Sequence, residues 1–410
     1  MSLKLIVLKL LPGINKYRFQ WVNFYKRFFY FLRNLPGKSD LFGPPRGLYK
    51  DSLSFPKPSG IKVVILSERF SLTRKLPNTQ SIKVKEKFEN HQEAHINRKS
   101  CFFLEGARYY SGDGGFVITK DDKLLKPCSP SRNEWAEERH HAFYRLKLPN
   151  TTYLSKVVLI DSKEADSNFG HWFMDLLPRF LYLNELEIDF QDYILCLNVG
   201  TMDFHKESLD HLKDMGFNFK AILPVRSLNF CADELIIPPY CTKDGLNQNY
   251  WARSTAEINF IKKLIPGENV PDGPEKIYIS RRKSIRSFEQ EKKIIDFLQE
   301  SGYAEVFLED LSLIEQAKLF YNATHIVGLH GSGFSNLFHC RPQTKILEIF
   351  NANFIVTDFW SISNILDLDY HAYCDDCFWK AGVPYRLARN TPTEINIESL
   401  IVYLGNNDFL

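Results

Sequence analysis

The stretch that decides the fold is "IVGLHGSGFSNLFHCRPQTKILEIF", residues 326–350. An apolar run stops at His330, a turn of small residues follows, and a second apolar run contains one acid, Glu348. Short apolar runs separated by a glycine turn are typical of buried strands. If the first run is a parallel strand, His330 lies at its carboxyl end, where open α/β sheets bind ligands.

The turn after His330 has the composition of a phosphate-binding loop. Its glycines let the backbone bend tightly and approach a ligand closely, and a helix that starts after them directs free N–H groups at the same point. Glu348 would face the same crevice, where a carboxylate accepts both hydroxyls of a ribose. The alternative is a turn that only starts a helix beside a core histidine.

Strands and helices alternate along the chain outside residues 1–60. Amphipathic spacing predicts helices at 287–302 and 312–323. This alternation predicts parallel sheets with helices on their faces. The predicted strands are 62–67, 156–161, 193–198, 234–239, 276–281, 304–309, 325–330 and 345–350.

At 410 residues the chain is too long for one hydrophobic core. We therefore expect two α/β domains, one at 41–245 and one at 246–410. The composition is globular, with 44% hydrophobic and 25% charged residues, and a net charge of +3 does not indicate nucleic-acid binding.

Residues 1–40 form a basic, aromatic segment. The stretch "YRFQWVNFYKRFFYFL" mixes lysine and arginine with Trp, Tyr and Phe, and it is too charged for a transmembrane helix. Two interpretations are open: the segment contacts the surface of an anionic membrane, or it packs its aromatic face on the body of the protein. It resembles no secretory signal, so we expect a cytoplasmic protein, peripheral on the inner membrane face.

Two further clusters of charged residues are candidates for ligand binding or catalysis. Arg281, Arg282 and Arg286 follow a predicted strand, and arginine forks grip phosphate oxygens in pairs. In "DSNFGHWFMDLLPR", helical spacing puts His171, Asp175 and Arg179 on one face among bulky apolar residues; a buried structural network is the alternative.

In order, "NFGHWFMDLLPR", "YISRRKSIR", "LHGSGFSNLFHCRP" and "ILEIF" resemble glycosyltransferase family 61, over about residues 155–380. The resemblance implies a GT-B fold, with two Rossmann-like domains whose parallel sheets face a central cleft. The N-terminal domain at 41–245 would be the acceptor side, and the C-terminal domain at 246–410 the donor side. It also implies transfer of a sugar, with inversion, from a nucleotide-sugar donor to a saccharide or glycolipid acceptor in surface polysaccharide biosynthesis. We expect a UDP-sugar donor.

Inverting transfer needs one base and a stabilised leaving group. The catalytic candidates are Asp175 as the base, with His171 orienting it or acting in its place. The donor-binding candidates are Arg281, Arg282, Arg286, His330, Gly331, Ser332, Gly333, Asn336 and Glu348.

No metal or other cofactor is expected to be essential, because arginines and a helix end can stabilise the diphosphate. The sequence still offers two patterns that bind metals elsewhere. One is a DxD at 367–369, which suits Mn²⁺ or Mg²⁺, and the other is "CDDC" at 374–377. Two other functions stay open: a nucleotide-sugar hydrolase or epimerase, and an inactive membrane-associated scaffold.

Overall fold

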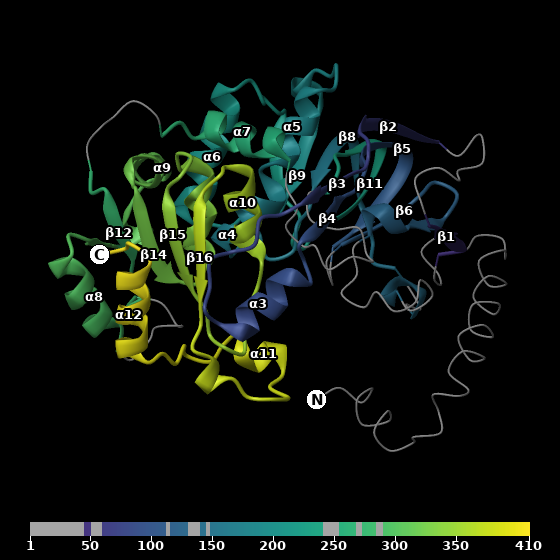
Figure 1. Cartoon of the computed structure of the whole chain (residues 1–410). Coiled ribbons are helices and arrows are strands. Elements are labelled where there is room, and N and C mark those ends of the chain that lie inside the picture. Colours follow the sequence, from purple (N-terminus) through teal and green to yellow (C-terminus); the bar gives the residue numbers. More distant parts are fainter. Residues whose placement is uncertain are drawn as a thin grey trace, which may run out of the picture.

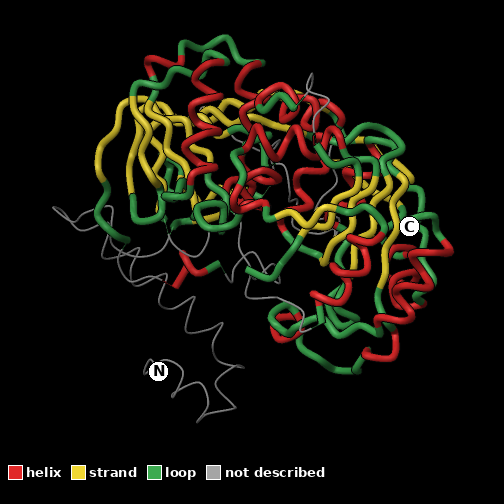
Figure 2. Tube along the Cα trace, turned by 90° about the vertical axis from the view of Figure 1, so that its left-hand side faces the viewer, coloured by secondary structure: helices red, strands yellow, loops and turns green. Residues whose placement is uncertain are grey.

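Two β-sheets with helices between them form the framework of this computed structural model (Figures 1 and 2). The structure describes residues 45–50, 60–111, 115–129, 140–144, 148–240, 254–267, 273–283 and 290–410. The membrane-surface segment predicted at 1–40, the predicted boundary at 245/246 and Arg286 lie outside these residues. Among the described residues, no helix has the length and apolar character needed to cross a membrane.

The first sheet is mixed. Four of its strands are parallel neighbours, in the order β11-β8-β9-β10, and the long strand β5 runs antiparallel to both β11 and β2. Its strands are β1 (Gly47–Tyr49), β2 (Ile61–Ser67), β5 (Lys99–Tyr110), β6 (Phe116–Ile118), β7 (Lys123–Leu125), β8 (Thr152–Ile160), β9 (Ile194–Leu197), β10 (Ala221–Pro224) and β11 (Asn229–Ile237). A separate hairpin pairs β3 (Phe70–Thr73) with β4 (Glu93–Ile96).

The second sheet is entirely parallel. Its order is β13-β12-β14-β15-β16, which is 2-1-3-4-5 when the strands are numbered along the chain. In such doubly wound sheets the connections leave a switch point between the first and third strands. The strands are β12 (Lys276–Ile279), β13 (Ala304–Val306), β14 (His325–Leu329), β15 (Lys345–Ile349) and β16 (Asp369–Tyr373).

Helices cover both faces of the second sheet because its strands alternate between two cores. Ile277 and Ile279 face the core that also contains the helices of the first half, whereas Tyr278 faces a core under α8 and α12. Figure 1 shows α8 and α12 on the side away from the first sheet. The helices are α3 (Ile82–Glu89), α4 (Phe169–His171), α5 (Arg179–Asn184), α6 (Asp203–Asp214), α7 (Thr255–Leu264), α8 (Glu291–Glu300), α9 (Leu313–Asn322), α10 (Asp358–Ile365), α11 (Tyr385–Ala388) and α12 (Ile397–Asn406).

Short helical turns complete the chain. The π-helix is η4 (Trp172–Leu176), and the 3-10 helices are η1 (Lys126–Cys128), η3 (His141–Tyr144), η5 (Phe190–Asp192), η6 (Leu308–Asp310), η7 (Ser332–His339) and η8 (Asp376–Phe378). All eight predicted strands and both predicted helices are present. The expectation of two parallel sheets is confirmed for the second sheet only; in the first, β5 turns back along β11 and makes the sheet mixed.

A segment of the first half lies on the second sheet. We call residues 74–91 the α3 strap. Trp360 donates its indole N–H to the carbonyl of Lys75 at 2.8 Å, and Asn78 forms a parallel β-bridge with His371 of β16. The Phe88 ring packs edge-on against Trp360, with ring centroids 4.9 Å apart, and also contacts Phe350 and Tyr370.

Phe88→Ala should lower the free energy of unfolding by about 3–5 kcal/mol, because its fully buried ring fills an aromatic cluster that cannot collapse easily. Urea unfolding measures the change. Ile82→Ala is the control on the same helix; that side chain is 65% exposed, so we expect a change within about 0.5 kcal/mol. Equal effects of the two substitutions would show that the strap is not anchored by Phe88.

Candidate active site

The carboxyl ends of β12 and β14 meet at the switch point of the second sheet. Arg281 follows β12 and His330 follows β14, and the two strands are paired neighbours. The Arg281 guanidinium donates through Nη1 to the His330 carbonyl, while its backbone N–H donates to Glu291 Oε1 at 2.7 Å. The predicted strand ends thus bring a cation and a histidine to the edge where such sheets bind ligands.

Gly331 is required by this contact. A Cβ added at Gly331 would lie 2.1 Å from Arg281 Nη1, so any other residue at this position would displace the guanidinium. The guanidinium therefore lies directly against the backbone of the turn. Directly after it, η7 begins with Ser332 and Gly333, which are only partly buried, so the first backbone N–H groups of this helix are near the surface beside Arg281.

Glu348 holds His330 in place. Its Oε1 lies 2.5 Å from His330 Nδ1, and its Oε2 accepts a hydrogen bond from the Tyr370 hydroxyl. The His330 ring also stacks on Phe350, with centroids 5.3 Å apart. Glu348 is 1% exposed, and this burial raises the pKa of its carboxyl to about 8, although the Tyr370 hydrogen bond opposes the rise. Both carboxyl oxygens have protein partners, which favours positioning of His330 over the ribose contact that we predicted for Glu348.

The Asn336 side chain makes hydrogen bonds inside the protein. Its side-chain amide donates to Gln316 Oε1 of α9 at 2.8 Å and to the Gly333 carbonyl at 3.2 Å, and the residue is buried. The asparagine therefore ties η7 to α9. Its predicted contact with the donor stays a prediction.

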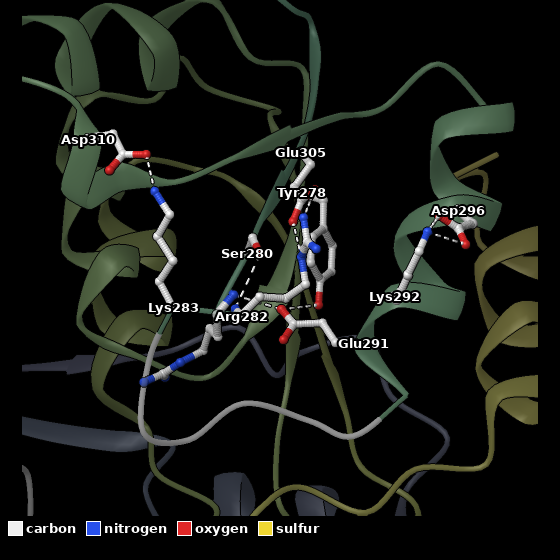
Figure 3. Close-up of polar contacts among 10 residues, drawn as sticks. Tyr278, Ser280, Arg282, Lys283, Glu291, Lys292, Asp296, Glu305 and Asp310 are labelled. Atoms are coloured by element: carbon white, nitrogen blue, oxygen red, sulfur yellow. Dashed lines mark hydrogen bonds and ion pairs between the residues drawn. The ribbon is translucent and has the colours of Figure 1, made fainter.

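Arg282 is engaged elsewhere. Its guanidinium forms two parallel hydrogen bonds with Glu305 of β13, at 2.8 and 2.7 Å (Figure 3). The guanidinium also lies over the Phe307 ring. Lys283 is similarly paired with Asp310 (Figure 3). The structure describes two of the three predicted phosphate-binding arginines. Arg281 lies beside His330, and Arg282 is paired with Glu305 at the edge of the sheet.

In the first half, a π-helical turn separates the three residues that we predicted on one helix face. Pro178 has no N–H for an i→i−4 bond, and the N–H of Leu177 bonds the carbonyl of Trp172 five residues back. His171 Nδ1 lies 2.7 Å from Asp175 Oδ2, as the helical spacing predicted. Arg179 instead points to the first sheet.

The Arg179 side chain is fully buried and donates to the carbonyls of Asp161 and Pro238 at 2.6 and 2.9 Å. Its guanidinium also lies over the Tyr240 ring. The prediction that His171, Asp175 and Arg179 share one face is therefore wrong for Arg179, because the wider π turn rotates the helix that follows. Arg179 anchors the loop after β8, on which the His171 segment depends.

The His171 imidazole is the accessible member of its pair: its side chain is 26% exposed, against 10% for Asp175. Its Nε2 faces Glu164 Oε2 at 3.5 Å, and Arg389 lies 3.8 Å from the same carboxylate. Burial lowers the pKa of His171, but the hydrogen bond and charge of Asp175 and the charge of Glu164 outweigh it, so the pKa lies above its usual value.

The two predicted motifs meet in space. A Cβ added at Gly170 would lie 3.4 Å from Ser332 Cβ and 3.5 Å from Ser335 Oγ, so the backbone of α4 lies in contact with η7. His171 follows Gly170 directly, and the HGSG turn of residues 330–333 contains Ser332. The structure thus brings the histidine–aspartate pair of the first half next to the switch point of the second.

Sequence reasoning missed Asp358, the first residue of α10. Burial, followed by the charges of Glu348 and Asp175, raises the pKa of its carboxyl to about 8, and the charges of His171 and Lys87 oppose the rise. Asp358 is therefore within electrostatic reach of both histidine–carboxylate pairs. No motif marks it, since its surroundings come from four separate elements.

The two metal-binding patterns flank β16, one before it and one after it. Asp369 begins β16 and so lies at the amino edge of the sheet, opposite the switch point, where it pairs with Asn78 and His371. Cys374 and Cys377 are both free thiols. Within the described ranges, no group of three or more His, Cys, Asp or Glu residues is arranged to hold a metal ion.

Comparison with known proteins confirms the family resemblance. The family model Glycosyltransferase 61 matches residues 169–347, which run from the helix that carries His171 through the Arg281 and HGSG segments to β15. This part of the chain is therefore similar to the proteins of glycosyltransferase family 61. The chain is also similar to the β-1,2-xylosyltransferase RCN11 of Oryza sativa subsp. japonica, with 34% identity over 62 residues, which make up 15% of this chain and 12% of the rice protein.

The raised pKa of Glu348 has a consequence for stability. The carboxyl of Glu348 has a pKa of about 8 in the folded protein, against the ordinary 4.5. Between these two pH values the folded state binds a proton that the unfolded state has lost. The free energy of unfolding therefore falls as the pH rises from 4.5 to 8. Glu348→Gln should remove this loss, making the variant gain up to about 5 kcal/mol relative to the parent between pH 5 and 9.

Urea unfolding at a series of pH values measures this difference. Glu309→Gln is the control, because Glu309 is exposed and its substitution should shift stability by less than about 0.5 kcal/mol at every pH. A Glu348→Gln difference that stays flat with pH would mean that Glu348 is ionised in the folded protein.

Proposed function

We propose that this protein is an inverting glycosyltransferase that moves a sugar from a nucleotide-sugar donor, with UDP as the expected nucleotide, to a hydroxyl of a saccharide or glycolipid acceptor. The observation that carries the proposal is the contact between Gly170 and Ser332, which sets the His171–Asp175 pair beside the HGSG turn and Arg281. A base and an anion-binding turn at one place are what a single displacement at a sugar carbon needs.

The second sheet supplies the donor side in this proposal. The diphosphate would lie at the switch point, where Arg281 and the first N–H groups of η7 neutralise its charge. As the acceptor oxygen bonds to the sugar C1, the bond from C1 to the phosphate oxygen breaks and its electron pair stays on the diphosphate. Arg281 and the helix end stabilise that charge, so the proposal requires no metal ion.

The first half supplies the base. We assign it to His171, with Asp175 as its positioning residue, which reverses the order favoured by the sequence. His171 is the more exposed of the two, and its Nδ1 is bonded to Asp175, so in this proposal Nε2, which lies 3.5 Å from Glu164 Oε2, takes the proton of the acceptor hydroxyl. The imidazolium that forms is stabilised by Asp175 and by Glu164, 3.5 Å from Nε2.

Inversion is part of the proposal, since one displacement with one base forms no covalent intermediate and reverses the configuration at C1. We further propose that the two sheets correspond to the two Rossmann-like domains of a GT-B enzyme. Surface polysaccharide biosynthesis at the inner membrane face is the proposed setting, on the basis of the basic aromatic residues at 1–40.

Nucleotide binding is the first test. Thermal unfolding with UDP, GDP, CMP or ADP at about 100 times the dissociation constant should show a stabilisation of about 2.7 kcal/mol with one nucleotide, UDP in our expectation. Arg281→Ala should abolish the shift. Arg282→Ala is the matched control and should keep it, because Glu305 already holds that guanidinium.

Adding EDTA separates the outcomes. A shift that survives EDTA supports the metal-independent proposal, and one that EDTA abolishes contradicts it. If none of the four nucleotides stabilises the protein, the transferase proposal fails. That result would favour the alternative of an inactive membrane-associated scaffold.

Removal of the base should affect the rate and not donor binding. His171→Asn should lower the release of nucleoside diphosphate, assayed with an oligosaccharide panel, by about 10²–10⁴-fold without weakening nucleotide binding. His211→Asn, in the last turn of α6, is the control and should change neither quantity.

The pH profile distinguishes base from positioning residue. His171 must be neutral to accept a proton, so the rate should rise with pH through a pKa above 6.5. Asp175→Asn should move this limb to lower pH, because the hydrogen bond and charge of Asp175 contribute most to raising the pKa of His171. A limb that stays in place when Asp175 is replaced would assign the base to another residue.

A further inference from the structure

The loop between β8 and α4 keeps Glu164 in a left-handed backbone conformation. The φ of Glu164 is +71°, a value that residues with a side chain rarely adopt. The loop is fixed around it, because the Ser162 N–H donates to Asn198 Oδ1 at 2.7 Å. On the other side, His205 Nε2 lies 2.9 Å from the carbonyl oxygen of Ala165, which is fully buried. Glycine would fit this position at a lower cost, so the strain points to a use for the glutamate side chain.

The Glu164 carboxylate lies directly beside the proposed base. Its Oε2 is 3.5 Å from His171 Nε2 and 3.8 Å from Arg389 Nη2. A separation of 3.5 Å exceeds an ordinary N–H···O hydrogen bond, yet it is too short for a water molecule or a hydroxyl group to lie between the two atoms. Glu164 therefore takes up space next to the nitrogen that receives the proton in the proposed reaction.

Arg389 belongs to a segment that is fixed at the carboxyl edge of the second sheet. It directly follows α11, and the nearby Pro392 carbonyl accepts a hydrogen bond from Asn351 Nδ2 at 3.0 Å. Asn351 comes directly after Phe350, the residue whose ring stacks on His330. The ion pair of Arg389 thus connects the loop after β8 with the edge where the donor would lie.

Both members of this ion pair reach solvent. The side chain of Glu164 is 31% exposed and that of Arg389 is 41% exposed. An ion pair with this exposure contributes little to stability, so a ligand can replace it without much cost. The backbone of Glu164 is fixed, but its carboxylate can rotate away from His171.

We propose that Glu164 is a specificity-determining residue that selects a saccharide hydroxyl over water as the nucleophile. Without acceptor, its carboxylate excludes water from His171 Nε2. A saccharide displaces the carboxylate, because its further hydroxyls supply binding energy that a single water molecule lacks. The inference rests on the proposed function, since it assumes that His171 is the base.

Replacing Glu164 with glycine should convert part of the activity to hydrolysis of the donor. A water molecule then binds at His171 Nε2, gives its proton to that nitrogen and bonds to the sugar C1 through its oxygen. The bond from C1 to the phosphate oxygen breaks, and its electron pair leaves with the diphosphate. The products are the free sugar and the nucleoside diphosphate, and His171 later loses the proton to solvent.

The test measures release of nucleoside diphosphate with no saccharide present. The probes are UDP-glucose, UDP-galactose, UDP-xylose, UDP-N-acetylglucosamine and GDP-mannose. Glu164→Gly should raise the release from at least one probe by about 10²-fold, the low end of what a positioned base contributes. The double variant Glu164→Gly with His171→Asn should lose this gain.

Asp408→Gly is the matched control. Asp408 also has a left-handed φ, +56°, but its carboxylate is paired with Lys345 at the start of β15, on the opposite edge of the sheet. This substitution relieves the same backbone strain and should leave release unchanged. Thermal unfolding checks the fold of Glu164→Gly, and its midpoint should not fall, because glycine suits the backbone at this position.

The outcomes separate the two proposals. If UDP or GDP binds but Glu164→Gly releases no more nucleoside diphosphate than the parent, the role of Glu164 is overturned and the proposed function stands. A gain that persists in the double variant also overturns it, since the water would then react without His171. If the unaltered protein binds neither UDP nor GDP, both proposals fail together.

Discussion

The contact of the Arg281 guanidinium with the backbone of His330 and Gly331 is the constraint on which the rest of the site depends. It joins the carboxyl ends of two neighbouring strands, and it is possible only because residue 331 has no side chain. With the turn fixed in this way, η7 must start beside the arginine, and the His330 ring is directed inward to Glu348. One close approach thus sets the position of the cation, the helix end and the histidine.

The two histidine–carboxylate pairs have the same chemistry but different surroundings. Glu348 is almost completely enclosed and is also bonded by Tyr370, so the His330 pair is a fixed part of the frame. The His171 pair is more open, and its histidine is the outer member. Burial therefore decides which pair maintains geometry and which can exchange a proton with a ligand.

Local sequence patterns were sufficient to predict the strands of the second sheet and part of the candidate site. The strands of the second sheet, and with them the meeting of Arg281 and His330 at one edge, follow from apolar runs and the rule for parallel sheets. The close contact of His171 with Asp175 follows from helical spacing. These features depend on residues near one another in the chain or on the common direction of parallel strands.

Features that depend on distant partners could not be predicted in this way. Arg282 pairs with Glu305 on the edge strand, and Arg179 is turned toward the first sheet by a π turn that the pattern of apolar residues does not reveal. Asp358 has no motif, because the charged groups that affect its pKa come from four separate elements. The antiparallel strand β5 was missed for the same reason, since its direction is set by pairing with β11.

The α3 strap also bears on how such proteins can diversify. Its residues precede most of the first sheet in the chain, yet they cover aromatic residues of the second sheet and lie near Asp358 through Lys87. The two halves are therefore not interchangeable modules. A recombination event that joined the first half of one relative to the second half of another would inherit a strap shaped for a different sheet, so donor and acceptor preferences have to change by substitution within a whole chain.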